Sequence, residues 1–342
     1  MTDNEISSIS DLLRILTELG EPAEGHSRFF RGQGNAEWDI LPGIYRNQKL
    51  VENEDKIIKE TLLNCPDDFS PADTLLEKLV KLQHYGYPTR LLDLTANALV
   101  GLYFACSNLE HHDKDGQLII LDIPNENVKY DDSDKVSLLS AIALQNNSFD
   151  VKKALDDCFK SMAINGKFHL NRINSALEGM SDFIDKNLES VKEFTKDLDL
   201  DSKKIIEEKK DELMKQINLE VFNNQTDIVN LLGTIRQDKP SFDSRVLFED
   251  LANVLCVKVK LNNNRISRQQ GSFLIVGIDN SKLLPARIPN AWQRKHNGSE
   301  IIVKADSKTK ILKELKAFGI SKQILFPELE SQASEIIAQY SK

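Results

Sequence analysis

The sequence is poor in several features that would each identify a large class of proteins. Its four cysteines, among 342 residues, share no CxxC or Cys/His metal spacing and are typical of idle thiols in a reducing compartment. No stretch approaches the roughly 18 consecutive apolar residues that a membrane-spanning helix needs. The first residues also lack the basic and apolar regions of a secretory signal. We therefore expect a cytoplasmic protein without a membrane partner.

The sequence has fewer basic than acidic residues, and its formal net charge is −9. This balance argues against nucleic-acid binding along the phosphate backbone, although a local basic pocket remains compatible with it. The motifs GxxxxGK[ST], HExxH, GxSxG and GxGxxG do not occur, so kinase, zinc protease, serine hydrolase and dinucleotide-binding Rossmann functions have no support. With 40% hydrophobic and 28% charged residues, the chain has the composition of a globular protein of one or two domains.

The richest group of reactive side chains lies in residues 83–95. An imidazole, two phenols, a guanidinium, a carboxylate and two aliphatic hydroxyls occur there, directly before an apolar segment at 98–105. A polar group beside a buried element must be paired or must serve a ligand, because leaving it unpaired costs roughly 1–3 kcal/mol. The pattern favours a functional site. The structural alternative is a turn in which His84, Arg90 and Asp93 satisfy one another.

Hydrophobic periodicity predicts an α+β fold with a compact mixed sheet core and flanking helices. Helices are expected over residues 7–19, 71–85, 97–107, 308–318 and from 329 onward. Strands are expected over residues 29–33, 116–123, 254–261, 272–277 and 301–304. The strand at 254–261 is expected to be half-buried, because its apolar residues alternate with lysines.

The composition changes between residues 131 and 253, where charged residues dominate and proline occurs once, at Pro240. Residues 182–219 suit an exposed amphipathic helix pair. We therefore expect a charged helical insertion at 131–253 between two parts of one core, residues 1–130 and 254–342. The insertion is expected to contribute little to a site and to serve as a lobe, a lid or an arm for a homo-oligomer.

Four separated polar clusters, at residues 30–33, 83–95, 115–117 and 265–273, resemble in their order the FRG domain family, which is named after its Phe-Arg-Gly motif. Further matching motifs are Leu41–Arg46, Gln83–Gly86, Pro88–Asp93, Gln269–Phe273, Phe318–Ile320 and Leu325–Pro327. The resemblance covers roughly residues 25–124 and 245–329. It implies one core interrupted by the helical insertion, and it supplies little about function.

The order of these parts also resembles, more weakly, the Arg-Ser-Glu class of ADP-ribosyltransferases. That resemblance implies NAD as the ligand, with Arg31 gripping the pyrophosphate and with Thr89 and Thr95 in the hydroxyl motif. Gln270 stands where that class has its catalytic glutamate. Because a neutral amide cannot supply the charge that stabilises a cationic centre, either Asp93 replaces the glutamate or transferase activity is absent.

The candidate catalytic residues are therefore Asp93, Gln270 and His84, and no metal site is predicted. The candidate ligand-binding residues are Arg31, Gly32, Gln33, Tyr85, Thr89, Arg90, Thr95 and Gln269. Together they predict a nucleotide-handling enzyme that cleaves NAD or transfers ADP-ribose to a macromolecular target, in a bacterial toxin or phage-defence setting that the resemblance alone suggests.

Two other functions remain open. One is a ligand-sensing or protein-binding module without catalysis. The other is a metal-dependent nuclease that uses Asp93, Asp115 and Asp122 as oxygen ligands. Structural roles are open as well: Arg31 can pair with Asp93, His84 can close a helix, Gln269 and Gln270 can bond a turn, and Arg265 and Arg268 can be surface cations.

Overall fold

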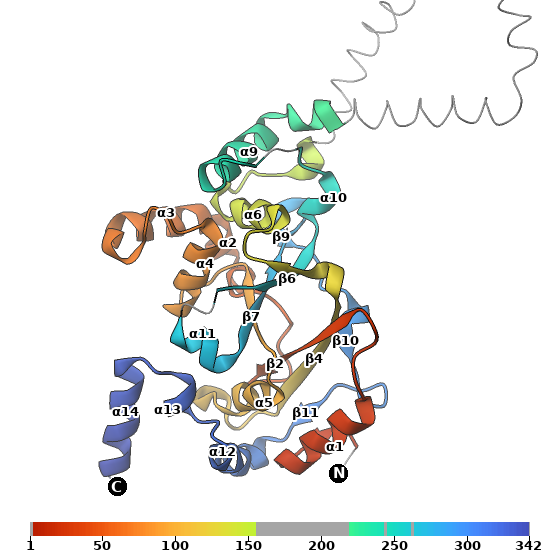
Figure 1. Cartoon of the computed structure of the whole chain (residues 1–342), viewed down its shortest axis with the longest axis vertical. Coiled ribbons are helices and arrows are strands. Elements are labelled where there is room, and N and C mark those ends of the chain that lie inside the picture. The colour runs from red at the N-terminus through yellow and green to blue at the C-terminus, as the bar shows by residue number, and fades with distance from the viewer. Residues whose placement is uncertain (1–2, 155–218, 243–244, 261–262, 342) are drawn as a thin grey trace, which may run out of the picture.

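The computed structural model describes residues 3–154, 219–242, 245–260 and 263–341 (Figure 1). The helix pair expected over 182–219 lies outside these residues as far as residue 218, and so does Cys158. Within the described residues the chain forms a mixed sheet with helices packed on it, which confirms the α+β fold class.

Nine described strands form the main sheet in the order β1-β11-β4-β2-β3-β7-β6-β5, with β10 also paired to β4. β1 with β11 and β5 with β6 are parallel pairs, and the other neighbours are antiparallel. The strands are β1 (Glu5–Ile6), β2 (His26–Gln33), β3 (Leu91–Thr95), β4 (Gly116–Pro124), β5 (Val128–Tyr130), β6 (Val254–Lys258), β7 (Gly271–Val276), β10 (Gln293–Arg294) and β11 (Ile302–Val303). β8 (Ile278–Asp279) and β9 (Ser281–Pro285) form a separate pair.

Helices cover one face of the sheet in two groups (Figure 1). α1, α5 and α12 pack against β2, β4 and β11, whereas α4, α6 and α9 pack against β3, β6 and β7. The opposite face buries a third cluster that includes Phe29, Leu94 and Trp292. The described helices are α1 (Ile9–Leu19), α2 (Gln48–Glu52), α3 (Glu54–Asn64), α4 (Leu75–His84), α5 (Ala98–Cys106), α6 (Asp134–Ala141), α9 (Thr226–Asp238), α10 (Phe248–Leu251), α11 (Asn264–Gln269), α12 (Lys308–Ala317), α13 (Lys322–Leu325) and α14 (Leu329–Tyr340).

The helix expected over 71–85 begins four residues later, at Leu75. Thr74 and Glu77 form a capping box there: the Thr74 hydroxyl accepts from the Glu77 amide, and the Glu77 carboxylate accepts from the Thr74 amide. This reciprocal pair satisfies two amides that the first turn cannot pair itself. The helix therefore begins at the Thr74 cap. The prediction that it begins at Pro71 is wrong.

The strand expected to be half-buried, β6, is buried along most of its length. Val254, Leu255, Cys256 and Val257 are all buried, because both faces of the sheet are covered at this strand. Leu255 and Val257 join the cluster beneath α4 and α6, and the other two join the cluster on the opposite face. Successive residues of β6 therefore point into two different buried clusters, and neither face of this strand is open to solvent at these residues.

The described helices of the 131–253 segment belong to the main core. Val136 of α6 and Ile228 and Ile235 of α9 are fully buried in the same cluster as Leu91 of β3 and Ile275 of β7. The expected division of the chain into three parts stays a prediction.

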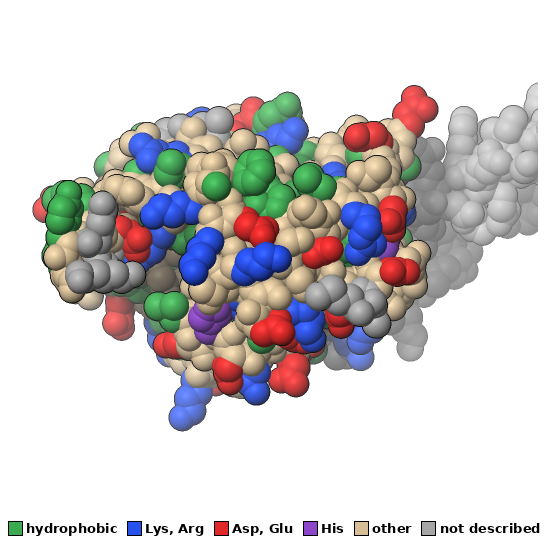
Figure 2. Space-filling view, turned by 90° about the horizontal axis from the view of Figure 1, so that it is seen from below, with side chains coloured by type: hydrophobic (Ala, Val, Ile, Leu, Met, Phe, Trp, Pro, Cys, Tyr) green, Lys and Arg blue, Asp and Glu red, His purple; other side chains and the backbone are tan. Residues whose placement is uncertain are grey.

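The outer surface shows no concentration of one charge on the face drawn in Figure 2, where acidic and basic side chains are interspersed. Several apolar side chains near the C-terminal end are exposed, among them Phe318, Leu329, Ile337 and Tyr340. In the described part of the chain, no helix is both long and apolar enough to cross a membrane.

Candidate functional site

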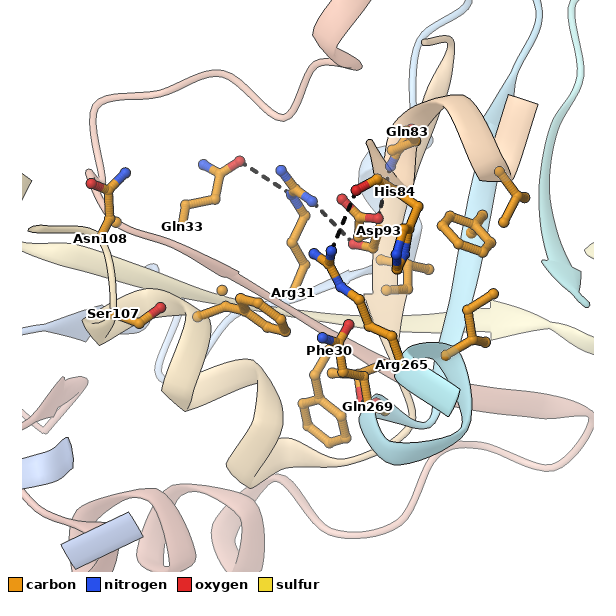
Figure 3. A pocket seen from close by; sticks show the side chains of 18 of the residues that line it. Phe30, Arg31, Gln33, Gln83, His84, Asp93, Ser107, Asn108, Arg265 and Gln269 are labelled. Carbon is orange, nitrogen blue, oxygen red and sulfur yellow. Dashed lines mark hydrogen bonds between the residues drawn. The ribbon is translucent and has the colours of Figure 1, made fainter. Parts of the chain in front are cut away.

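A cleft of about 430 Å³ lies where the two groups of helices meet, between β2, β3 and α11 and the ends of α4 and α5 (Figure 3). Its volume is within the range of small-molecule sites. Seven of the residues that the sequence selects line it: Arg31, Gly32, Gln33, His84, Asp93, Thr95 and Gln269.

The cleft opens because β2 and β3 separate. They share the paired position Phe30 with Thr95, whereas β2 pairs with β4 along its whole length. Alternation along the strands places Arg31 on the same face as Phe29, and Asp93 on the opposite face from Leu94. Arg31 and Asp93 therefore come from opposite faces of the sheet and meet at the gap between the strands.

Each residue of the Phe-Arg-Gly motif has a different physical task. Phe30 is buried in the core under α5, and Arg31 lines the cleft. Gly32 is required by packing: a Cβ there would lie 2.0 Å from the Gly101 carbonyl oxygen and 2.4 Å from the Ala105 nitrogen of α5. The motif thus packs α5 closely against β2 and places the Arg31 guanidinium at the gap between β2 and β3.

Arg31 carries a charge that the protein does not neutralise directly. Its Nη1 donates to the backbone oxygen of Asp93 at 3.0 Å, and its Nε donates to Gln33 at 3.4 Å. Burial lowers the pKa of Arg31 to about 10, with nearby Asp93 acting in the opposite direction. The guanidinium therefore stays protonated at neutral pH and retains donors for a ligand.

A chain of side-chain hydrogen bonds fixes the Asp93 carboxylate. The Thr89 hydroxyl donates to Gln83 Oε1, and Gln83 Nε2 donates to Asp93 Oδ1 at 2.7 Å. Thr89 is itself buried and accepts from the Leu91 amide, so the chain starts from a fixed group. Asp93 is exposed, and among the described lining residues it is the one carboxylate.

Two further arginines give the cleft a positive balance. Arg46 donates from Nε and Nη2 to the Leu41 oxygen and lies over the Trp38 ring. The Arg265 guanidinium lies 4.6 Å from the ring centre of Phe326, and its Nη1 donates to the His84 oxygen at 3.5 Å. Among the described residues, no carboxylate forms an ion pair with these two arginines or with Arg31. Three guanidinium groups therefore face one carboxylate.

His84 lies at the end of α4 and beside the cleft. Desolvation lowers the pKa of His84, Arg265 lowers it further, and Glu328 raises it. Its Nε2 is 3.2 Å from Glu328 Oε1. Because the overall shift is downward, the imidazole is mainly neutral at pH 7.

Thr95 and Gln269 line the cleft but are held by backbone partners. The buried Thr95 hydroxyl donates to the Gln269 oxygen at 2.6 Å and accepts from the Asn97 amide. The Gln269 side chain donates to the Leu325 oxygen at 3.1 Å. These bonds tie α11 to β3 on one side and to the C-terminal segment on the other.

Four sequence-selected residues do not line the cleft. Arg90 is fully buried in an ion pair with Glu54, and this carboxylate raises the pKa of Arg90 despite the opposing desolvation. Thr89 is buried beneath Gln83. Tyr85 is 64% exposed beyond the helix end. Gln270 ends α11 in the left-handed conformation, with φ of +47°, and is exposed.

The polar and aromatic lining residues that the sequence left without a role at the site are Trp38, Arg46, Gln83, Ser107, Asn108 and Arg265. Gln83 and Arg265 fall within two of the polar clusters, and Arg46 falls within a motif that resembles the FRG family. The sequence therefore contains a signal for these three residues. Asn108 and Ser107 follow α5 and reach the cleft only because Gly32 and Gly101 bring that helix close to β2.

A second hollow of about 280 Å³ adjoins the cleft, and the two share Val80, His84 and Ile266. Two of its charged groups, Glu77 and Lys260, pair with each other at 3.2 Å. His84 is the one titratable side chain among the three residues that the two hollows share.

The aspartates considered as metal ligands lie in different environments. Asp115 pairs with Lys304 at 2.6 Å, and Asp122 pairs with Arg28 at 2.7 Å, while Asp93 lies in the cleft. The described residues contain no group of three or more His, Cys, Asp or Glu side chains placed to hold a metal ion.

Residues 26–114 match the family model of the FRG domain. The matched residues span β2 to α5 and include Arg31, Gln83 and Asp93. Neither the curated proteins nor the solved structures gave a significant match. Arg265 and Gln269, on the other wall of the cleft, lie outside the matched residues.

Proposed function

We propose that the cleft binds a nucleotide through its diphosphate, and that the protein cleaves the N-glycosidic bond of NAD or transfers its ADP-ribose to a macromolecular target. The observation that carries this proposal is that, among the described lining residues, three guanidinium groups accompany one carboxylate, that of Asp93. Guanidinium groups bind phosphate oxygens bidentately, and burial strengthens such pairs. Arg31, Arg46 and Arg265 all suit this role, because among the described residues no carboxylate forms an ion pair with any of them.

Asp93 suits the bond-breaking step. When the N-glycosidic bond breaks, its electron pair goes to the nicotinamide nitrogen, and the ribose carbon becomes cationic. A fixed carboxylate stabilises that developing charge. In hydrolysis a water oxygen then bonds to the ribose carbon, and its proton passes to the solvent. Such an enzyme would fit a toxin or phage-defence setting, which the family resemblance alone suggests.

The experiment is to incubate the purified protein with NAD and to measure nicotinamide release. The wild-type protein should release nicotinamide, and Asp93→Asn should lower turnover with little change in melting temperature, because an asparagine oxygen still accepts from Gln83. Asp132→Asn, which removes an exposed carboxylate elsewhere, is the matched control. Equal turnover in wild type and Asp93→Asn would remove Asp93 from the mechanism.

A second function, a nucleotide sensor without catalysis, is favoured by the position of Gln270. This residue stands where the transferase class has its glutamate, yet it caps α11 outside the cleft. Binding of NAD without nicotinamide release would support the sensor over the enzyme.

A further inference from the structure

A short C-terminal segment, residues 324–328, contacts three side chains of the cleft wall. The Leu325 oxygen accepts from Gln269, the Phe326 ring lies against the Arg265 guanidinium, and the Glu328 carboxylate lies beside His84. The Ile324 oxygen also accepts from Arg268 of the same helix, α11, at 3.1 Å. The segment therefore backs the wall of the cleft that faces Arg31.

Glu328 is the least satisfied polar group in this region. Both of its carboxylate oxygens are buried and make no hydrogen bond with the described residues. Its one ion-pair contact is with His84 Nε2, at 3.2 Å. A buried carboxylate without partners is costly, so this group depends on the imidazole. His84 itself lines the cleft, so its ring lies beside the space that a ligand would fill.

Phe326 holds Arg265 without cancelling its charge. Its ring is fixed by Phe104 and Tyr103, at centroid distances of 6.1 Å and 6.5 Å. Cζ of the Arg265 guanidinium lies 4.6 Å from the centre of the Phe326 ring, within the range of a cation–π contact. An aromatic face orients a guanidinium and leaves its outer donors free for an anion, whereas a carboxylate would occupy them.

We propose that Phe326 and Glu328 are positioning residues for the anion-binding cleft: Phe326 holds Arg265 and Glu328 holds His84 toward a bound diphosphate. This inference rests on the binding part of the proposed function and is independent of catalysis. It adds residues outside the matched FRG domain to the site and makes the C-terminal segment a part of it.

The charged groups around His84 determine whether the affinity for a diphosphate rises or falls with pH. Arg265 of α11 and Glu328 face it from neighbouring segments, and the other charged groups lining the two hollows that it joins are Arg31, Arg46, Asp73, Glu77, Asp93, Lys81 and Lys260. Protonated His84 adds a positive charge beside the diphosphate, so affinity should rise as the pH falls. Because Glu328 favours the protonated imidazole, removing its charge should move this rise to lower pH.

The test is isothermal titration with ADP-ribose, whose diphosphate keeps its charge from pH 5.5 to pH 8. Phe326→Leu keeps an apolar side chain but loses the ring face, and it should weaken binding about three- to thirtyfold. Phe326→Tyr keeps the ring face and should bind within about twofold of wild type. Equal binding by wild type and Phe326→Leu would overturn the role of Phe326.

Glu328→Gln is measured over the same pH range, beside Glu300→Gln, which removes an exposed charge outside the cleft lining. Glu328→Gln should shift the pH dependence of the dissociation constant to lower pH, and Glu300→Gln should leave it in place. A profile of Glu328→Gln that coincides with wild type overturns the role of Glu328. If the wild-type protein does not bind ADP-ribose at all, the proposed function itself fails, and this inference fails with it.

Discussion

Gln83 donates from Nε2 to the Asp93 carboxylate at 2.7 Å. A neutral amide therefore holds this carboxylate, while Arg31 donates to the backbone oxygen of the same residue. Gln83→Leu removes that donor. A hydrogen bond to a charged group contributes about 1.5–3 kcal/mol, so turnover on NAD should fall about tenfold to a hundredfold. ADP-ribose affinity should change little, because Gln83 is not a phosphate ligand. Equal losses of turnover and affinity would contradict this role.

Gly32→Ala should destabilise the fold. The added Cβ would lie within 2.4 Å of two backbone atoms of α5, so the helix must move away from β2. Overpacking of this kind costs about 1–3 kcal/mol or more, measured as the free energy of unfolding in urea. Gly233→Ala is the matched control: no atom lies within 4 Å of its added Cβ, and alanine stabilises a helix interior by about 0.5–1 kcal/mol. Equal stability of the two variants would contradict the packing argument.

Glu54→Gln should destabilise the protein strongly. The Glu54 carboxylate bonds Arg90 Nε at 3.0 Å and lies 3.5 Å from Lys282 Nζ, and both cations are fully buried. Removing the charge of Glu54 leaves two buried positive charges without their ion-pair partner, at a cost of about 3–5 kcal/mol of unfolding free energy. Glu60→Gln, on the exposed side of α3, should stay within about 0.5 kcal/mol of wild type. A small effect of Glu54→Gln would show that water reaches these cations.

Lys282 should make stability depend on pH. Burial lowers the pKa of Lys282 to about 8, from the ordinary 10.5. Between these values the unfolded chain binds more protons than the folded protein, so the unfolding free energy rises with pH. The contribution of Lys282 is present above pH 10.5 and is lost as the pH falls through about 8.

Urea unfolding from about pH 7.5 to about pH 8.5 measures this slope below the ordinary pKa of Tyr45, which is 10.0, and of the buried Cys106 and Cys256, which is 9.0. Lys282→Met should make the curve flatter than that of wild type. An unchanged slope would assign the pH dependence to other groups.

Much of the fold is predictable from local pattern. α1 begins after Ser8, whose side chain caps it, and ends at Gly20 with φ of +67°. The strand at 116–123 and the helix at 97–107 also form where the pattern places them. Two predictions fail for different reasons. α4 starts at the capping box of Thr74 and Glu77 rather than at Pro71, although both signals are local. β6 is covered on both faces, which only the tertiary packing decides. The sequence marks residues 265–273 only as a polar cluster, whereas residues 264–269 form α11.

The site is harder to predict because it depends on contacts between distant segments. Arg31 and Asp93 meet only because β2 and β3 separate beyond one paired position. Arg90 and Asp93 are three residues apart, yet Arg90 pairs with Glu54 in the core while Asp93 faces the cleft. Arg265 reaches the cleft from a helix more than 170 residues later in the chain. No local pattern distinguishes such an arginine from a surface cation.

The most direct measurement is isothermal titration of ADP-ribose and of adenosine into the wild-type protein and into Arg31→Ala and Arg31→Lys. We predict that wild type binds ADP-ribose and not adenosine, because the diphosphate supplies the contacts. Arg31→Ala should lose about 2–5 kcal/mol of binding free energy at unchanged melting temperature, and Arg31→Lys should recover part of it as a point charge. Equal affinity of wild type and Arg31→Ala for ADP-ribose, or equal binding of adenosine and ADP-ribose, would contradict a diphosphate site at this cleft.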